Sequence, residues 1–226
     1  MVSKVSERIY AESAVKLLGV DWVFGEIAEP LDFEVRSGHD VFGLEVRQIF
    51  AGGEADFGSP LRRAENKNQS YVRDIASRYY SQGGRPISVK FLGPINGHQL
   101  EALVERMVHE APASPFERKT ISVGAIKIFL TALPKELANC QHWLCIDDRV
   151  GWVGEVTNGD LQYAIDCKRD KLPLYLAKYS TIDLLLVADR TVNSGRMRSA
   201  VSFSVQNPGF RAIYFLSYPE TITRVV

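Results

Sequence analysis

The sequence has few cysteines, and their spacing excludes most of the sites that cysteines build. There are three in 226 residues, Cys140, Cys145 and Cys167, and no two have CxxC spacing. This argues against a disulfide framework and against a zinc site, for which His142 is the only other candidate between the first two. We therefore expect reduced thiols in a cytoplasmic protein.

Long apolar runs and targeting segments are also missing. No stretch approaches the roughly 18 apolar residues of a transmembrane helix. The first ten residues, MVSKVSERIY, lack the apolar centre of a signal peptide. These absences predict a cytoplasmic location and no membrane partner.

An excess of charge of either sign is absent, since 27 Lys and Arg residues balance 27 Asp and Glu residues. Proteins that coat nucleic acid normally carry a basic excess, so the balance argues against a large phosphate-binding surface but not against a local basic patch. GGRP and GWVG lack the spacing of a phosphate-binding loop, and no G-x-S-x-G motif of a serine hydrolase occurs.

What the chain does have is enough apolar residues, 46%, to form a large core. No repeat or linker interrupts it, so we expect a single domain over residues 1–226. Periodicity predicts helices over 4–19, 61–82, 97–111 and 160–179, the last disturbed at Pro173, and strands over 22–27, 31–35, 41–50, 86–93, 119–123, 126–132, 141–146, 151–156, 182–189 and 211–218. This order predicts an α/β protein with α+β character, in which helices flank a central mixed sheet.

The order of the elements also predicts how some strands pair. The strand at 41–50, the helix at 61–82 and the strand at 86–93 favour a right-handed parallel crossover. The three strands between residues 119 and 146 are expected to be antiparallel neighbours.

The most informative pattern is a pair of alternating runs, LDFEV and VFGLEVRQIF, joined by the turn-rich SGHD. It predicts a β-hairpin. The apolar phase consists of Leu31, Phe33 and Val35 on the first strand and Phe42, Leu44 and Val46 on the second. The polar phase consists of Asp32, Glu34, Glu45 and Arg47.

Carboxylates that converge on this hairpin would form an oxygen-rich site suited to Mg²⁺ or Mn²⁺. Such a metal can activate water and stabilise the charge that develops on a phosphodiester. A hairpin with one exposed face and no function shows the same alternation, so the pattern alone leaves both interpretations open.

Several short motifs follow one another along the chain: a helix that carries Glu7, then Pro30-Leu31-Asp32-Phe33, then GLEVR from Gly43 to Arg47. Later come A-x-x-Y-Y up to Tyr80, P-x-x-V from Pro86, A-I-x-x-K-x-x-K-L from Ala164 and D-L-L-L from Asp183. Together they resemble the PD-(D/E)XK nuclease superfamily, in particular its poorly characterised bacterial members. The resemblance implies a restriction-endonuclease-like αβββαβ core with C-terminal elaborations.

The resemblance also implies a metal-dependent nuclease acting on DNA or RNA with Mg²⁺ or Mn²⁺. Asp32 matches the motif aspartate and Glu45 the acidic residue of the second strand, so both would be catalytic and would ligate metal. Glu7 would be the helix glutamate that completes the metal site, with Glu12 as a competitor. Glu7 is favoured because it shares the apolar face of its helix.

The sequence departs from the family at Arg47, where the pattern has lysine. Arginine can bind the scissile phosphate through its planar fork but cannot be deprotonated at neutral pH, which puts hydrolysis in doubt. Lys168 and Lys171, three residues apart on a predicted helix, are candidates to replace the lysine. The alternative is that both are solvated helix residues.

A second basic group lies on the helix predicted over 61–82. Arg62, Arg63 and Lys67, with tyrosines nearby, could follow a nucleic-acid backbone together with Lys168 and Lys171. Acidic residues dilute this group, and a solvated helix face is the alternative.

Two functions are therefore open. One is a metal-dependent nuclease; the other is the same scaffold without catalysis, serving as a protein- or nucleic-acid-binding module. The balanced charge and the missing lysine favour the second, whereas the acidic hairpin and the resemblance favour the first, which we prefer slightly. An open cleft between Asp32 and Glu45 would favour the enzyme, whereas a site filled by side chains or closed by a salt bridge would favour the binding module.

Overall fold

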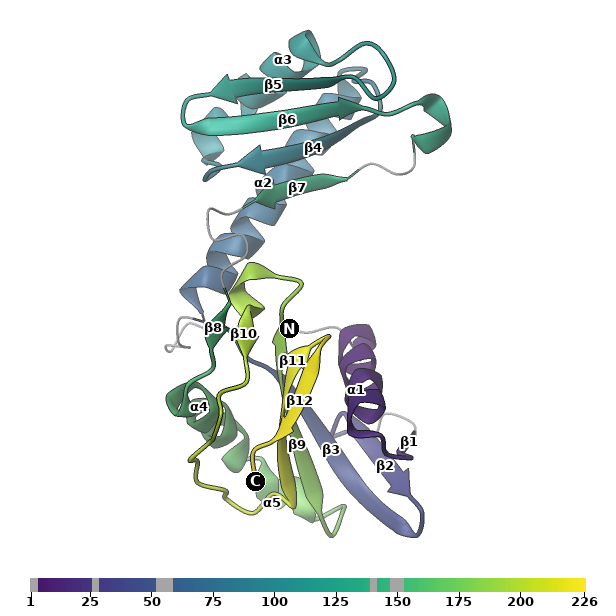
Figure 1. Ribbon diagram of the computed structural model, residues 1–226, viewed down its shortest axis with the longest axis vertical. Helices are drawn as coiled ribbons and strands as arrows, with labels where there is room; N and C mark the ends of the chain where they lie inside the picture. Colours follow the sequence, from purple (N-terminus) through teal and green to yellow (C-terminus); the bar gives the residue numbers. More distant parts are fainter. Residues whose placement is uncertain (1–3, 26–28, 52–58, 139–141, 147–152) are drawn as a thin grey trace. The chain divides into compact units, whose positions relative to one another are not determined.

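The computed structural model describes residues 4–25, 29–51, 59–138, 142–146 and 153–226 (Figure 1). The chain forms two compact units. The first combines Met1–Arg62 with Trp152–Val226, and the second, Arg63–Gly151, is inserted between these two segments. The predicted mixed α/β class, with a large mixed sheet flanked by helices, is confirmed. The single domain expected over residues 1–226 thus comprises two compact units.

The first unit is built on a six-stranded sheet in the order β1-β2-β3-β9-β11-β12. These strands are β1 (Val23–Phe24), β2 (Phe33–Ser37), β3 (Asp40–Gln48), β9 (Ile182–Asp189), β11 (Ala212–Tyr218) and β12 (Thr221–Arg224). β1, β2 and β3 are antiparallel, β9 lies parallel between β3 and β11, and β12 returns antiparallel. β8 (Gly154–Glu155) and β10 (Met197–Arg198) form a separate short pair.

Helices cover both faces of this sheet, because its central strands are apolar on both sides. α1 (Lys4–Leu18) packs Tyr10, Ala11 and Ala14 against one face. α4 (Asn158–Arg169) and α5 (Leu172–Leu176) cover the other face, where they share a core with β9 and β11. Every residue of β9 is buried, as its apolar run predicts. Helices on opposite faces therefore bring side chains to the two sides of β3.

The second unit has its own sheet, in the order β5-β6-β4-β7. Its strands are β4 (Ile87–Leu92), β5 (Arg118–Val123), β6 (Ile126–Ala132) and β7 (Trp143–Ile146). α2 (Pro60–Ser81) and α3 (Leu100–Glu110) pack against one face through a core that includes Ile75, Leu103 and Met107. The helices η1 (Gly97–Gln99) and η2 (Lys135–Leu137), and η3 (Asn193–Gly195) in the first unit, are short 3₁₀ turns.

Two predicted strand pairings are wrong. β3 does not form a crossover with β4, because β4 belongs to the other sheet; the parallel partner of β3 is β9. β7 is not antiparallel to β6 but pairs in parallel with β4, whereas the antiparallel pairing of β5 with β6 is confirmed. Local patterns indicate strands, but they do not specify which distant strand becomes the neighbour.

Element boundaries differ in smaller ways. The helix predicted over 160–179 divides into α4 and α5, and the break lies just before Pro173, which is tolerated in the first turn of α5. β12 was not predicted. Part of the predicted strands 22–27 and 151–156, most of the predicted loop 51–60 and Cys140 lie outside the described residues. None of the described helices has the length and apolar character needed to cross a membrane.

Candidate functional site

The predicted hairpin is formed by β2 and β3, with Phe33 opposite Leu44 and Val35 opposite Phe42. Phe33 and Val35 join Leu44 and Val46 in the core beneath α1, as the alternation predicts. Leu31 does not share their face, contrary to prediction, and packs in the core beneath α4 and α5. The extended strand begins only at Phe33, so the alternation does not reach back to Leu31.

Gly43 explains the position of Leu31. A Cβ atom at Gly43 would lie 2.3 Å from Leu31 Cδ1 and 2.8 Å from Ile182 Cδ1, so the missing side chain makes room for both. Leu31 thereby crosses to the α4 side of the sheet. The next side chain, Asp32, contacts residues of α1 instead.

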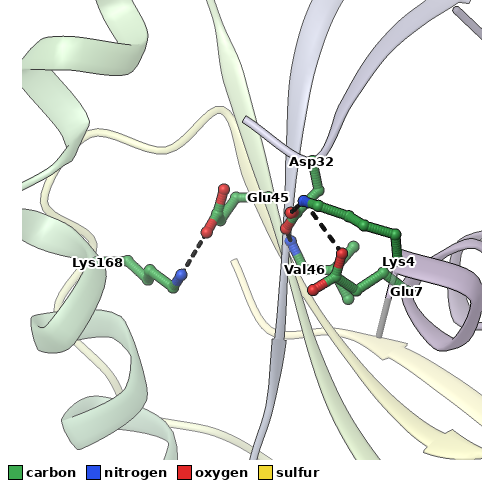
Figure 2. A network of polar contacts seen from close by, with 6 residues as sticks. All are labelled: Lys4, Glu7, Asp32, Glu45, Val46 and Lys168. Carbon is green, nitrogen blue, oxygen red and sulfur yellow. Dashed lines mark hydrogen bonds and ion pairs between the residues drawn. The ribbon is translucent and has the colours of Figure 1, made fainter. Parts of the chain in front are cut away.

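Asp32 is held from both helix and strand (Figure 2). Its Oδ1 accepts a 2.8 Å hydrogen bond from Lys4 Nζ on α1, and its Oδ2 accepts a 2.9 Å bond from the backbone N–H of Val46 on β3. The residue is 8% exposed. These bonds fix the carboxylate of Asp32 beside Val46 of β3, the residue that follows Glu45.

Glu7, rather than Glu12, joins this group. Glu7 Oε2 lies 3.3 Å from Lys4 Nζ, so one ammonium links Glu7 to Asp32. Burial, and then the negative charge of Asp32, raise the pKa of the Glu7 carboxyl. Glu12 instead pairs with Arg8 at 2.6 Å on an exposed part of α1.

Glu45 extends from β3 towards α4, where it forms an ion pair with Lys168 Nζ (Figure 2). Both side chains are largely buried, at 5% and 15% exposure. Burial, and then the charge of Asp32, raise the pKa of Glu45, while Lys168 and a hydrogen bond from Tyr175 oppose the rise. Burial and the charge of Glu45 also raise the pKa of Tyr175. Asp32 is therefore close enough for its charge to oppose the ionisation of Glu45.

The remaining predicted residues are distributed around the chain. Arg47 follows on β3 and is half-buried, and Lys171 is exposed at the start of α5. Arg62 lies over the ring of Phe50, with 5.3 Å between its guanidinium carbon and the ring centre. Arg63 and Lys67 are exposed on α2. Of the two lysines proposed to replace the motif lysine, only Lys168 contacts a carboxylate of the site among the described residues.

The carboxylate oxygens of the site meet part of what one Mg²⁺ or Mn²⁺ ion requires of its ligands. Glu45 Oε2 is buried and has no hydrogen-bond partner among the described residues, so a carboxylate lone pair is left without a protein donor. No group of three His, Cys, Asp or Glu residues that could hold a metal ion occurs in the described part of the chain. Mg²⁺ commonly binds through only one or two carboxylates, with water and substrate phosphate completing its shell. In this chain Asp32 and Glu45 would be the two carboxylates of such an arrangement.

Comparison with known proteins gives no relative: no family model, curated protein or solved structure matches the chain. Function therefore has to be inferred from the site itself.

Sequence reasoning missed two members of the site, Lys4 and Tyr175. Lys4 precedes Glu7 by three residues on one helix, a spacing that brings opposite charges together and was available in the sequence. Tyr175 follows the break between α4 and α5, and its approach to Glu45 depends on how α5 packs on the sheet.

Proposed function

We propose that the chain is a metal-dependent phosphodiesterase of the PD-(D/E)XK type that hydrolyses DNA or RNA at Asp32, Glu45 and Lys168. The observation that carries the proposal is the Lys168 ammonium, held by Glu45 next to Asp32. The hairpin itself has Arg47 in place of the motif lysine. Lys168 of α4, which is distant from the hairpin in the sequence, is the lysine that contacts the carboxylate of Glu45.

Asp32 and Glu45 would hold one Mg²⁺ or Mn²⁺, which supplies an activated water and neutralises charge on the phosphate when bound. Lys168 carries a compact ammonium that can orient a water molecule or a phosphate oxygen once its pairing with Glu45 loosens. Lys4 holds Asp32 in place, and Glu7 adds a second negative charge beside it. Strand alternation places Arg47 on the same side of β3 as Glu45, and its guanidinium group is suited to bind phosphate.

The second candidate function is a binding module without catalysis. Each of the two central carboxylates already has a lysine partner, Lys4 for Asp32 and Lys168 for Glu45. Such internal pairing neutralises charge that a metal would otherwise neutralise. A site closed by salt bridges in this way is what the binding alternative requires.

Calorimetric titration of Mn²⁺ separates the two functions. Wild-type protein is expected to bind Mn²⁺, and the Asp32→Asn/Glu45→Gln double variant to lose binding, because carboxamides do not supply the negative oxygens the ion requires. Glu34→Gln is the matched control, since Glu34 lies on the same hairpin but pairs with Arg36. Absence of Mn²⁺ binding by the wild type, alone and with a non-cleavable oligonucleotide, would contradict the enzyme and favour the binding module.

The pH dependence of that binding tests the site further. Burial and the charge of Asp32 raise the pKa of Glu45, so its carboxyl takes up a proton at a higher pH than an ordinary glutamate. Metal and proton compete for the carboxylate, and Mn²⁺ affinity is therefore expected to fall as the pH decreases from neutral to 4.5, the ordinary pKa of a glutamate. An affinity that stays constant over this range would show that Glu45 is not a ligand.

Cleavage assays on DNA and RNA test the role of Lys168. With Mg²⁺ or Mn²⁺, Lys168→Met is expected to lower the cleavage rate by about 10² or more. Arg169→Met is the control, because Arg169 is the next residue on α4 and pairs with Asp166 at the surface. Equal rates for Lys168→Met and wild type would remove Lys168 from the mechanism.

A further inference from the structure

The sheet of the second unit has one face without a helix among the described residues. In Figure 1, α2 and α3 lie behind this sheet. The residues of its strands that point towards the helices form one core, which includes Val89 and Phe91 of β4 and Ile128 and Leu130 of β6. The alternate residues of each strand therefore form the opposite, open face.

The register of the strands gives the composition of this open face. Its members are Arg118, Thr120 and Ser122 of β5, Lys127, Phe129 and Thr131 of β6, Ser88, Lys90 and Leu92 of β4, and Leu144 and Ile146 of β7. Three are cations, four are hydroxyl side chains, and none is an aspartate or glutamate. In a chain whose total charge is balanced, a face with only positive charges favours a negatively charged partner.

The centre of the open face carries an exposed aromatic ring beside a cation. Phe129 of β6 is directly opposite Lys90 of β4 in the register, and its side chain is 39% exposed. Lys127 lies two residues from Phe129 on the same strand, roughly 7 Å away along it. On the far side of Lys90, Leu144 of β7 is 49% exposed. The exposed ring of Phe129 thus has a lysine beside it on the neighbouring strand and another on its own strand.

We propose that the open face of the β5-β6-β4-β7 sheet binds single-stranded RNA. Phe129 provides a surface on which an unpaired base can stack, and Lys90, Lys127 and Arg118 bind phosphates. Ser88, Thr120, Ser122 and Thr131 both donate and accept hydrogen bonds, as does the ribose 2′-hydroxyl that distinguishes RNA from DNA. A duplex does not suit the site, because its bases are stacked on one another and not accessible to Phe129.

This inference goes beyond the nuclease proposal and does not rest on it, because the open face and the carboxylates belong to different units of the chain. The binding test is made with the full chain in EDTA, so that no metal-dependent cleavage takes place. In the Asp32→Asn/Glu45→Gln background, Phe129→Ala is expected to weaken RNA binding by the same factor as in the wild-type background. An effect of Phe129→Ala that disappears in that background would overturn the assignment to the open face.

The primary experiment measures fluorescence anisotropy of a labelled mixed-sequence RNA oligonucleotide. Phe129→Ala is expected to weaken binding by at least about fivefold through lost stacking, and Phe129→Trp to retain it. The Lys90→Gln/Lys127→Gln/Arg118→Gln variant is expected to reduce the slope of log affinity against log salt by about 2. Lys119→Gln is the matched control, since Lys119 shares β5 with Arg118 but pairs in register with the core residue Leu130.

Three further results would overturn the inference. The first is no binding of RNA by the wild type at low salt. The second is binding that neither Phe129→Ala nor the triple variant weakens, because the RNA would then lie elsewhere. The third is equal or tighter binding of a DNA strand or a duplex of the same sequence, which would exclude single-stranded RNA as the specific partner.

Discussion

At the scale of single residues, the candidate site depends on the balance between burial and charge. Ionised Glu45 is almost fully inside the protein, and it is stable there because Lys168 supplies an opposite charge. Its pKa is nevertheless raised by burial, so the folded state favours the protonated form more than the unfolded state does. The sign of the linkage follows: Glu45 contributes most to stability at acid pH, and that contribution is lost as the pH rises through its raised pKa.

Substitution of Lys168 should reveal the free-energy cost of burying the ionised carboxylate of Glu45. Lys168→Met leaves a buried carboxylate without its cation and is expected to lower the free energy of unfolding by about 3 kcal/mol near pH 7. The loss should shrink near pH 4.5, where more of the Glu45 is protonated. Urea unfolding at the two pH values measures both.

Two companion variants sharpen this test. Glu45→Gln/Lys168→Met is expected to recover most of the stability, because neither position of the buried pair then carries a charge. Arg169→Met should change stability by less than about 0.5 kcal/mol, as expected for an exposed pair. An equal loss for Lys168→Met at both pH values would mean that the lysine stabilises the fold through packing, not charge.

At the scale of elements, a second buried ion pair fastens three strands together. Asp183 of β9 is fully buried, and Arg211, just before β11, donates to both of its oxygens at 2.8 and 2.7 Å. The guanidinium carbon of Arg211 also lies 3.6 Å from the centre of the Phe42 ring on β3. Arg211, at the start of β11, thus contacts both β9 and β3, the hairpin strand that carries Glu45.

Substitution of this arginine should therefore be costly. Arg211→Met is expected to lower the free energy of unfolding by about 3 kcal/mol, because the fully buried Asp183 loses the cation that pairs with it. Arg36→Met is the control, as its pair with Glu34 is exposed on the arginine side and should be worth less than about 1 kcal/mol. Equal effects in denaturant unfolding would contradict the role given to Arg211.

At the scale of the whole molecule, the chain has separate cores for its two units. The core of the second unit contains residues only of α2, α3 and the strands of its own sheet, together with the adjoining Ile95. The sheet of the first unit has one core beneath α4 and α5 and another beneath α1. Damage to one core is therefore expected to act first on its own unit.

Leu103→Ala tests this separation. Leu103 of α3 is fully buried, and its truncation is expected to cost about 3 kcal/mol. Hydrogen exchange should show lost protection in β4 and β6, with protection of β9 retained. Leu137→Ala, at a position that is 38% exposed, should leave both unchanged. An equal loss of protection in β9 would show that the two units unfold as one.

The sequence by itself determined the local structure and much of the candidate site. Alternation predicted the β2–β3 hairpin and the inward phase of Phe33 and Leu44. These predictions succeeded because the periods of strands and helices are properties of a few consecutive residues. The preference for Glu7 over Glu12 as a metal ligand stays a prediction, and in the structure Glu7 shares Lys4 with Asp32.

Only the tertiary structure decided which distant elements meet. It gave β3 the partner β9 in place of β4, separated the chain into two sheets, and brought Lys168 but not Lys171 to Glu45. Two lysines three residues apart look alike in the sequence, and the break between α4 and α5 separates them in the fold. The physical reason is that long-range pairing is selected by the packing of whole faces, and the energy of that packing is spread over residues far apart in the chain.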